Sequence, residues 1–156
     1  MKMIPKACPV VLRPGERIME LLVFEHPLAG HQLVKGTIEP NEPPELACLR
    51  ELNEETGLTG IIVKPLGQWQ SLPDSQHWYF FQVKIAGSTP ETWEHWTLDG
   101  GGLKFRCYWL PLLPTSSEQS LVTHPFTHPL FIGAFQFLLA QLKPLLEVES
   151  QIAQSK

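Results

Sequence analysis

The sequence predicts an α/β domain in which a mixed β-sheet lies between helices. Short apolar runs alternate with turn signals along most of the chain, a capped helix is indicated over residues 44–56, and apolar residues recur at helical spacing near the C-terminus. With 156 residues and 43% hydrophobic content, the chain can build one proper core but not two. We therefore expect a single domain over residues 1–156, with its core at about 5–147 and a tail at 148–156.

The first strands are predicted from apolar runs and turn chemistry. The runs at 7–12 and 19–25 are separated by RPGE, a turn signal, and so predict a hairpin. The segment HPLAGH at 26–31 is expected to be a loop, and 32–35 a brief strand. Asn41 is expected to hold the turn that follows, because Asn tolerates positive φ better than other non-glycine residues.

A helix is predicted from Pro44 to Thr56. Proline suits the first turn, where its missing N–H costs nothing, and Gly57 suits the left-handed position just past the end. At about 100° per residue, the helix has two arcs. One is aliphatic and the other acidic, namely Leu46, Leu49 and Leu52 against Glu51, Glu54 and Glu55. One face can be buried while the other presents three carboxylates.

The middle of the chain predicts three more strands. Residues 61–64 and the aromatic run at 77–85 are two of them, with a loop at 66–76 between. Residues 87–102 are glycine-rich and are expected to form a loop. The last strand is expected at 104–110.

A polar linker at 115–120 precedes the predicted C-terminal helix. Apolar residues from Leu130 to Leu142 recur at helical spacing, and Pro144 is expected to interrupt the helix. The two histidines of THPFTHP could suggest a metal, but a helix start with Thr127 as N-cap and Pro129 in the first turn explains them better. The simplest arrangement places the acidic helix on one side of the sheet and this helix on the other.

The acidic helix is the strongest chemical signal. Three carboxylates within one turn repel each other, and they sit near a helix C-terminus, where the macrodipole favours cations. A solvated acidic face is the simplest interpretation of such a helix. A hard cation such as Mg²⁺ would compensate the charges, and it usually keeps waters and substrate phosphates as its other ligands. The cluster therefore suggests phosphate chemistry.

The segment that contains this helix, GTIEPNEPPELACLRELNEETGL, resembles the Nudix box. It spans 23 of the 156 residues and fills every defined position, at Gly36, Glu42, Arg50, Glu51, Leu52, Glu54, Glu55, Gly57 and Leu58. The resemblance implies the Nudix fold, an α/β/α sandwich. Many relatives have glycine where this chain has Lys35 and Asn41. The carbonyl of Lys35 resembles the family's backbone metal ligand.

The resemblance also implies an activity and roles for the carboxylates. Family enzymes use divalent metal, here Mg²⁺ or Mn²⁺, to cleave the diphosphate linkage of a nucleoside diphosphate derivative by attack of water on phosphorus. Such substrates include nucleotide sugars such as ADP-ribose, dinucleoside polyphosphates and nucleoside triphosphates. Glu51 and Glu55 are expected to bind metal, and Glu54 to bind metal or to orient or deprotonate the water. Arg50 is expected to hold these carboxylates in place, with Glu42 as its ion-pair partner.

Some Nudix enzymes place a further acid outside the box. Glu94 is our choice for a general base, with Glu91 and Asp99 as alternatives on the same predicted loop. Trp93 and Trp96 could stack on a nucleobase, because aromatic rings offer sequence-tolerant stacking, or they could anchor the loop by packing.

Two other functions stay open at this stage. One is a Nudix-fold sensor that binds a nucleotide without turnover, which loss of the carboxylates would favour. The other is an isomerase of isoprenoid diphosphates on this fold, which would use an acid and a cysteine such as Cys8 or Cys107.

Composition narrows the partners and the compartment. The net charge of −4 gives no electrostatic footprint for duplex nucleic acid or an anionic membrane. Three scattered cysteines do not form a disulfide framework or a zinc motif, and the N-terminus is not a signal peptide, so a cytoplasmic enzyme is expected. The C-terminal helix could pack within one chain or across a homodimer.

Overall fold

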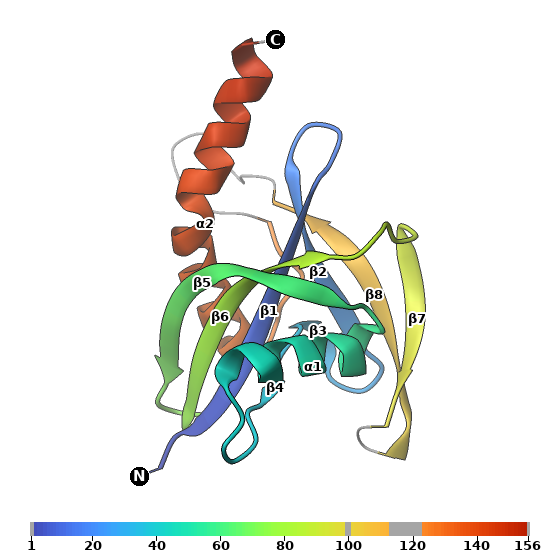
Figure 1. The fold of residues 1–156 in the computed structure, drawn as a ribbon, viewed down its shortest axis with the longest axis vertical. Coiled ribbons are helices and arrows are strands. Elements are labelled where there is room, and N and C mark those ends of the chain that lie inside the picture. Colours follow the sequence, from blue (N-terminus) through green and yellow to red (C-terminus); the bar gives the residue numbers. More distant parts are fainter. Residues whose placement is uncertain (1, 99–100, 113–122, 156) are drawn as a thin grey trace.

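The computed structural model describes residues 2–98, 101–112 and 123–155, with side chains as far as Leu146 (Figure 1). Two helices and a set of strands follow one another along the chain. Their order is β1 (Ile4–Pro14), β2 (Met19–His26), β3 (Gly30–Leu33), β4 (Gly36–Thr37), α1 (Pro44–Thr56), β5 (Gly60–Ser71), β6 (Gln76–Ile85), β7 (Thr92–Thr97), β8 (Leu103–Pro111) and α2 (Pro129–Ser155).

The described strands belong to one sheet, in which β1 and β2 each pair with three other strands. The main order is β5-β6-β1-β2-β8-β7, with β3 beside β2 and β4 beside β1. Residues Ile4–Val11 of β1 run parallel to β6, whereas its last three residues, Leu12–Pro14, pair antiparallel with β2. Because the β1–β6 pair is parallel and the other pairs are antiparallel, the sheet is mixed, as predicted.

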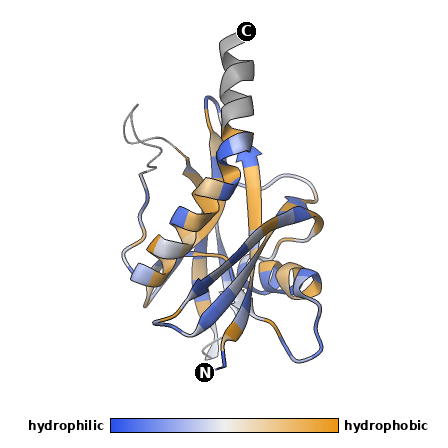
Figure 2. Cartoon of the chain, turned by 90° about the vertical axis from the view of Figure 1, so that its left-hand side faces the viewer, coloured by the Kyte–Doolittle hydropathy of each residue, from blue (hydrophilic) through white to orange (hydrophobic). Residues whose placement is uncertain are grey.

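Each face of the sheet carries its own core and its own helix. On one face, Trp78 and Phe80 pack against Phe135 and Leu138 of α2. On the other face, Phe24 packs in the cluster that contains residues of α1. Figure 2 shows the strands between the two helices, so the predicted α/β/α arrangement is confirmed.

Helix α1 has the predicted bounds and the predicted end. Pro44 lies in its first turn, and Gly57 adopts φ 80° and donates its N–H to the carbonyl of Asn53. Asn41 holds the preceding turn with φ 64°. The predicted arcs are only partly correct, because Leu46 is exposed while the carboxylates of Glu51 and Glu55 are buried. The buried face of α1 is therefore part apolar and part acidic.

The prediction of a loop over residues 87–102 is wrong for its middle, which forms strand β7. The exposure of its residues alternates, and β7 pairs along its whole length with β8. Strand β5 likewise continues through the expected loop to Ser71, paired with β6. Strand β3 begins at Gly30, within the expected loop. In all three places, the strand is stabilised by hydrogen bonds to a partner strand, and this pairing cannot be predicted from the local sequence.

Helix α2 also departs from its prediction, because it does not stop at Pro144. Leu145 and Leu146 still pack against the core, and the helix includes the segment expected to be a tail. Its N-cap is His128, not Thr127: the His128 carbonyl accepts from Ile132 N–H and its Nδ1 from Leu130 N–H. The expected linker at 115–120 lies outside the described residues.

The first part of α2 is long and apolar enough to cross a membrane by length and composition alone. In the structure, one side of this stretch packs on the sheet. Its buried side chains are Leu130, Phe131, Ala134, Phe135, Leu138 and Leu142. This packing is typical of a helix that covers a sheet.

Candidate active site

The site is built around a close approach between α1 and Gly36. Strand β4 pairs with β1 through Ala7 and Gly36, and this places Gly36 directly under α1. The carboxylate of Glu51 lies against the Gly36 backbone, so that a Cβ atom at position 36 would overlap its Cδ and both oxygens. Any other residue here would have to displace the Glu51 carboxylate, which glycine leaves in place.

The three glutamates of the helix lie in different environments. Glu51 and Glu55 are 7% and 5% exposed, whereas Glu54 is exposed to solvent. The carboxylate of Glu55 accepts a hydrogen bond of 2.8 Å from the backbone N–H of Lys35. Residues 35–36 therefore contact both buried carboxylates through main-chain atoms.

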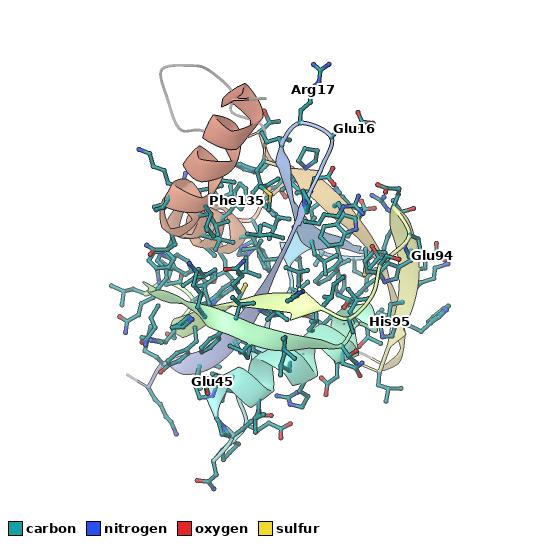
Figure 3. All side chains as sticks on the ribbon, turned by 45° about the horizontal axis from the view of Figure 1, so that its top comes forward. Glu16, Arg17, Glu45, Glu94, His95 and Phe135 are labelled. Carbon is teal, nitrogen blue, oxygen red and sulfur yellow. The ribbon has the colours of Figure 1, made fainter. Side chains whose placement is uncertain are left out.

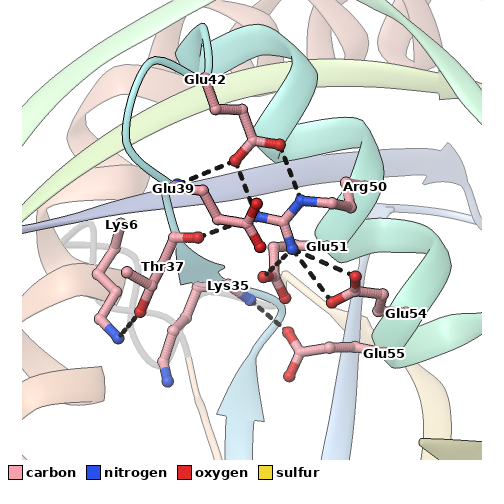
Figure 4. Close-up of polar contacts among 9 residues, drawn as sticks. All are labelled: Lys6, Lys35, Thr37, Glu39, Glu42, Arg50, Glu51, Glu54 and Glu55. Atoms are coloured by element: carbon pink, nitrogen blue, oxygen red, sulfur yellow. Dashed lines mark hydrogen bonds and ion pairs between the residues drawn. The ribbon is translucent and has the colours of Figure 1, made fainter. Parts of the chain in front are cut away.

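Arg50 joins Glu42, Glu51 and Glu54 into one network (Figure 4). Its Nε and Nη2 each donate to Glu42 at 2.8 Å, which confirms the predicted ion pair. Its Nη1 donates to Glu51 at 2.8 Å and to Glu54 at 3.2 Å. Hydrogen bonds from Arg50 and from the N–H of Glu39 lower the pKa of Glu42 to about 2. In turn, Glu42, Glu54 and Glu51 raise the pKa of Arg50.

This network relieves the repulsion that the sequence predicts for the acidic helix. Arg50 draws Glu51 and Glu54 toward itself, and Glu55 turns to the Lys35 amide. Within the described part of the chain, no three Cys, His, Asp or Glu side chains are placed to hold a metal ion together. The donor set still fits a hard divalent cation, since it consists of carboxylate oxygens beside a glycine that leaves them room.

Two lysines lie beside this network. Lys6 of β1 donates from Nζ to the Thr37 hydroxyl at 2.7 Å, and the ammonium of Lys35 lies 5.6 Å from the ring centroid of Phe131. Burial lowers the pKa of Lys6, and so does the charge of Lys35. The sequence alone does not indicate that these side chains lie near each other, because the pairing of β1 with β4 is what brings them together.

Strand β7 separates the other predicted site residues onto two faces. The indole of Trp93 donates to the Thr56 carbonyl at 2.9 Å, and its ring packs in the core beside α1, as the packing alternative requires. His95, on the same face, packs against Gly57 at the end of α1. Figure 3 shows His95 on the side of β7 toward α1 and Glu94 on the outer side.

Glu94 and Trp96 therefore do not join the carboxylates of α1. Alternate residues of a strand point to opposite faces, so these two lie on the face away from that helix. Both are exposed, and both contact Lys104: Glu94 forms an ion pair of 3.3 Å, and the Lys104 ammonium lies 5.7 Å from the Trp96 ring centroid. The structure does not bring the predicted general base to the Nudix-box acids. Asp99 lies outside the described residues.

A further polar cluster, missed in the sequence, lies on strands β2, β3 and β8. His31 Nδ1 is 2.7 Å from the Tyr108 hydroxyl, and its Nε2 is 3.4 Å from Glu25. Arg106 pairs with the same glutamate at 3.0 Å. The only sequence signal is that Glu25 and His31 flank a short turn, where they become partners in the β2–β3 hairpin.

The three cysteines are buried, which removes the support for a cysteine-dependent isomerase. Burial raises the pKa of Cys107 to about 12 and the pKa of Cys8 well above its usual value. Both therefore stay protonated near neutral pH, and a neutral thiol is a poor nucleophile or base.

The fold is a mixed sheet between two helices. At the site, Gly36 leaves room for a carboxylate of the acidic helix, and Arg50 holds that carboxylate in place. This combination defines a protein of the Nudix class. The model of the NUDIX domain matches residues 3–114, and the chain belongs to this family. A solved structure described as "NUDIX hydrolase from Nitrosomonas europaea" resembles it with a TM-score of 0.57 and 20% sequence identity. That match covers 89% of this chain and 90% of the other. It supports the fold.

A curated relative shares more sequence over a shorter stretch. It is the Bacillus subtilis (strain 168) protein named "Putative 8-oxo-dGTP diphosphatase YtkD", which is 40% identical over 68 residues. The matched stretch covers 44% of this chain and 41% of that protein. The chain thus spans less than half the length of this relative.

Proposed function

We propose that the protein is a Nudix pyrophosphohydrolase, dependent on Mg²⁺ or Mn²⁺, that cleaves the diphosphate linkage of a nucleoside diphosphate derivative in the cytoplasm. The observation that carries this proposal is the pair of buried carboxylates, Glu51 and Glu55, held against Gly36 and the amide of Lys35. Burying two carboxylates costs free energy unless their negative charge is compensated. A bound cation would compensate that charge, so a role as metal ligands explains why both acids are buried.

Each residue of the network has a role in this proposal. Glu51 and Glu55 would hold the ion, with the Lys35 carbonyl as a backbone ligand, and a divalent cation supplies charge neutralisation and an acidified water when it is bound. Glu54 is the exposed acid beside them, so it can orient or deprotonate the water. Arg50 positions the carboxylates through its hydrogen bonds.

The substrate group attached to the diphosphate is a separate question. Nucleoside triphosphates, dinucleoside polyphosphates and nucleotide sugars such as ADP-ribose are the candidates. The name of the Bacillus subtilis relative adds 8-oxo-dGTP to the triphosphates that should be tested.

The test is phosphate-bond cleavage across these substrates with Mg²⁺ or Mn²⁺, in wild type and in Glu54→Gln and Glu55→Gln. Glutamine keeps the size of the side chain and an acceptor oxygen but removes the charge. Each variant should lose at least about 10² in rate, because a metal-binding or water-activating carboxylate is gone. Glu45→Gln, at an exposed position in the first turn of the same helix, is the matched control and should retain wild-type activity.

Two results would overturn the proposal. If Glu54→Gln and Glu55→Gln both turn over as fast as Glu45→Gln, the acids are not catalytic. If wild type cleaves no substrate but calorimetry detects tight nucleotide binding, the protein is a Nudix-fold sensor.

A further inference from the structure

Two lysine side chains beside the acidic network have no part in the proposed chemistry. Lys6 belongs to β1 and contacts Thr37, its partner in the β1–β4 pairing. Lys35 precedes β4, and its ammonium lies near Phe131 at the start of α2. In Figure 4 both side chains point away from α1.

The lysines and the carboxylates approach the same segment from opposite faces of the sheet. Alternation along β1 places Lys6 on the face of Cys8 and Val10, which belong to the core under α2. The contact of Lys35 with Phe131 places its ammonium on that face too. The carboxylates of Glu51 and Glu55 come from α1 and meet the chain at residues 35–36.

Neither lysine forms an ion pair with a described acid, although the charges of Glu51 and Glu55 act on Lys6 and raise its pKa against the lowering by burial and by Lys35. Among residues 2–98, 101–112 and 123–146, no carboxylate lies within 4.0 Å of the ammonium of Lys6 or Lys35. The two charges are close enough for Lys35 to lower the pKa of Lys6. Two like charges on one side of a two-residue strand favour an anionic ligand that touches both.

We propose that Lys6 and Lys35 bind a phosphate group beyond the diphosphate held at the carboxylates. The preferred substrates are then nucleotides with three or more phosphates, such as nucleoside triphosphates and dinucleoside polyphosphates. A nucleotide sugar such as ADP-ribose has only two phosphates, so it gains nothing from the lysines. This inference rests on the proposed hydrolase function and names the substrate class within it.

The first experiment compares kcat/KM for ATP, dGTP, diadenosine tetraphosphate and ADP-ribose in wild type, Lys6→Gln, Lys35→Gln and the double variant. Each single variant should lose about tenfold or more on the first three substrates, because a charge-assisted contact is gone, and the loss should appear mainly in KM. Activity on ADP-ribose should change less than about twofold. Arginine at either position keeps the charge and should restore most of the loss.

The second experiment measures binding directly and needs neither metal nor turnover. Inorganic tripolyphosphate is titrated into wild type and the double variant in a calorimeter, without divalent ions. The double variant should bind at least about tenfold more weakly. Lys84→Gln, at an exposed position on β6, removes the same formal charge and should bind as wild type does.

The outcomes separate this inference from the proposed function. Efficient cleavage of ADP-ribose with little cleavage of the triphosphates would overturn the lysine proposal and leave the hydrolase intact. Equal losses on ADP-ribose and on triphosphates, or tripolyphosphate binding by the double variant equal to that of Lys84→Gln, would overturn it as well. If wild type cleaves nothing, the hydrolase proposal fails, and the binding experiment alone decides the role of the lysines.

Discussion

Glu42 lies on the turn before α1, apart from the other acids, yet it sets the position of Arg50. The guanidinium has five donors in a rigid fork, so it can bond Glu42 through Nε and Nη2 while Nη1 still reaches Glu51 and Glu54. Lysine, with a single ammonium, cannot reproduce this pattern. Through its contact with Arg50, Glu42 therefore helps to fix the positions of the Glu51 and Glu54 carboxylates.

Glu42→Gln is expected to destabilise the protein by about 1–2 kcal/mol at pH 7, after allowance for solvent screening of a surface ion pair. The folded-state pKa of Glu42, about 2, lies below its usual value of 4.5, so the stabilisation is fully present above about pH 4.5. It is lost as the pH falls toward 2. Urea unfolding at pH 7 and pH 3 should therefore show a smaller difference between variant and wild type at pH 3.

Glu45→Gln is the control for this pH dependence, because Glu45 is exposed on the same helix and is not one of the acids that pair with Arg50. Its effect should stay within about 0.5 kcal/mol at both pH values. A Glu42→Gln difference that grows as the pH falls would contradict the assigned sign.

At the scale of residues, spacing along the chain could predict some contacts and not others. Glu42 and Arg50 are eight residues apart on one turn and helix, so their pairing follows from the local motif. Lys6 and Thr37 are 31 residues apart, and Tyr108 is 77 residues from His31. Contacts of this kind depend on which strands pair, which the sequence does not state.

At the scale of elements, α1 could be predicted because its signals are local. Proline at the start, glycine at the end and the periodicity between them all agree. Strand β7 could not be predicted, because its stability comes from β8 and from contacts with α1. Pro144 removes one hydrogen-bond donor from α2, but the apolar residues that follow it still pack on the core, so the helix continues.

The contact between β7 and α1 gives a test at this scale. Trp93→Phe keeps the aromatic ring but removes the hydrogen bond to the Thr56 carbonyl, and it should cost about 1 kcal/mol of stability. If Trp93 is a packing residue, KM for nucleotide substrates should not change. Trp96→Phe alters a side chain that is 68% exposed, so it should change stability by less than about 0.5 kcal/mol.

Denaturant unfolding of the two tryptophan variants measures both effects under the same conditions. A large rise in KM for Trp93→Phe without loss of stability would instead favour the base-stacking role. Equal destabilisation by the two substitutions would show that the Thr56 contact has no special weight.

At the scale of the whole molecule, one sheet serves two cores. Strand β1 contributes Val10 to the core under α2 and Val11 to the core beside α1, and it also pairs with β6, β2 and β4. If the packing on either face of the sheet is lost, one side of β1 becomes exposed to solvent. This sharing supports the proposal of a single cooperative domain.

Leu52→Ala in α1 and Leu138→Ala in α2 test this cooperativity, since both side chains are fully buried but lie in different cores. Each should lower the free energy of unfolding by about 2–5 kcal/mol, through lost burial and the cavity left behind. Leu28→Ala, on a side chain that is 82% exposed, should cost less than about 0.5 kcal/mol. If the two faces unfold together, circular dichroism and tryptophan fluorescence give coincident transitions in both core variants. Separate transitions in Leu138→Ala would mean that α2 and its face of the sheet unfold on their own, and the single-domain proposal would then be wrong.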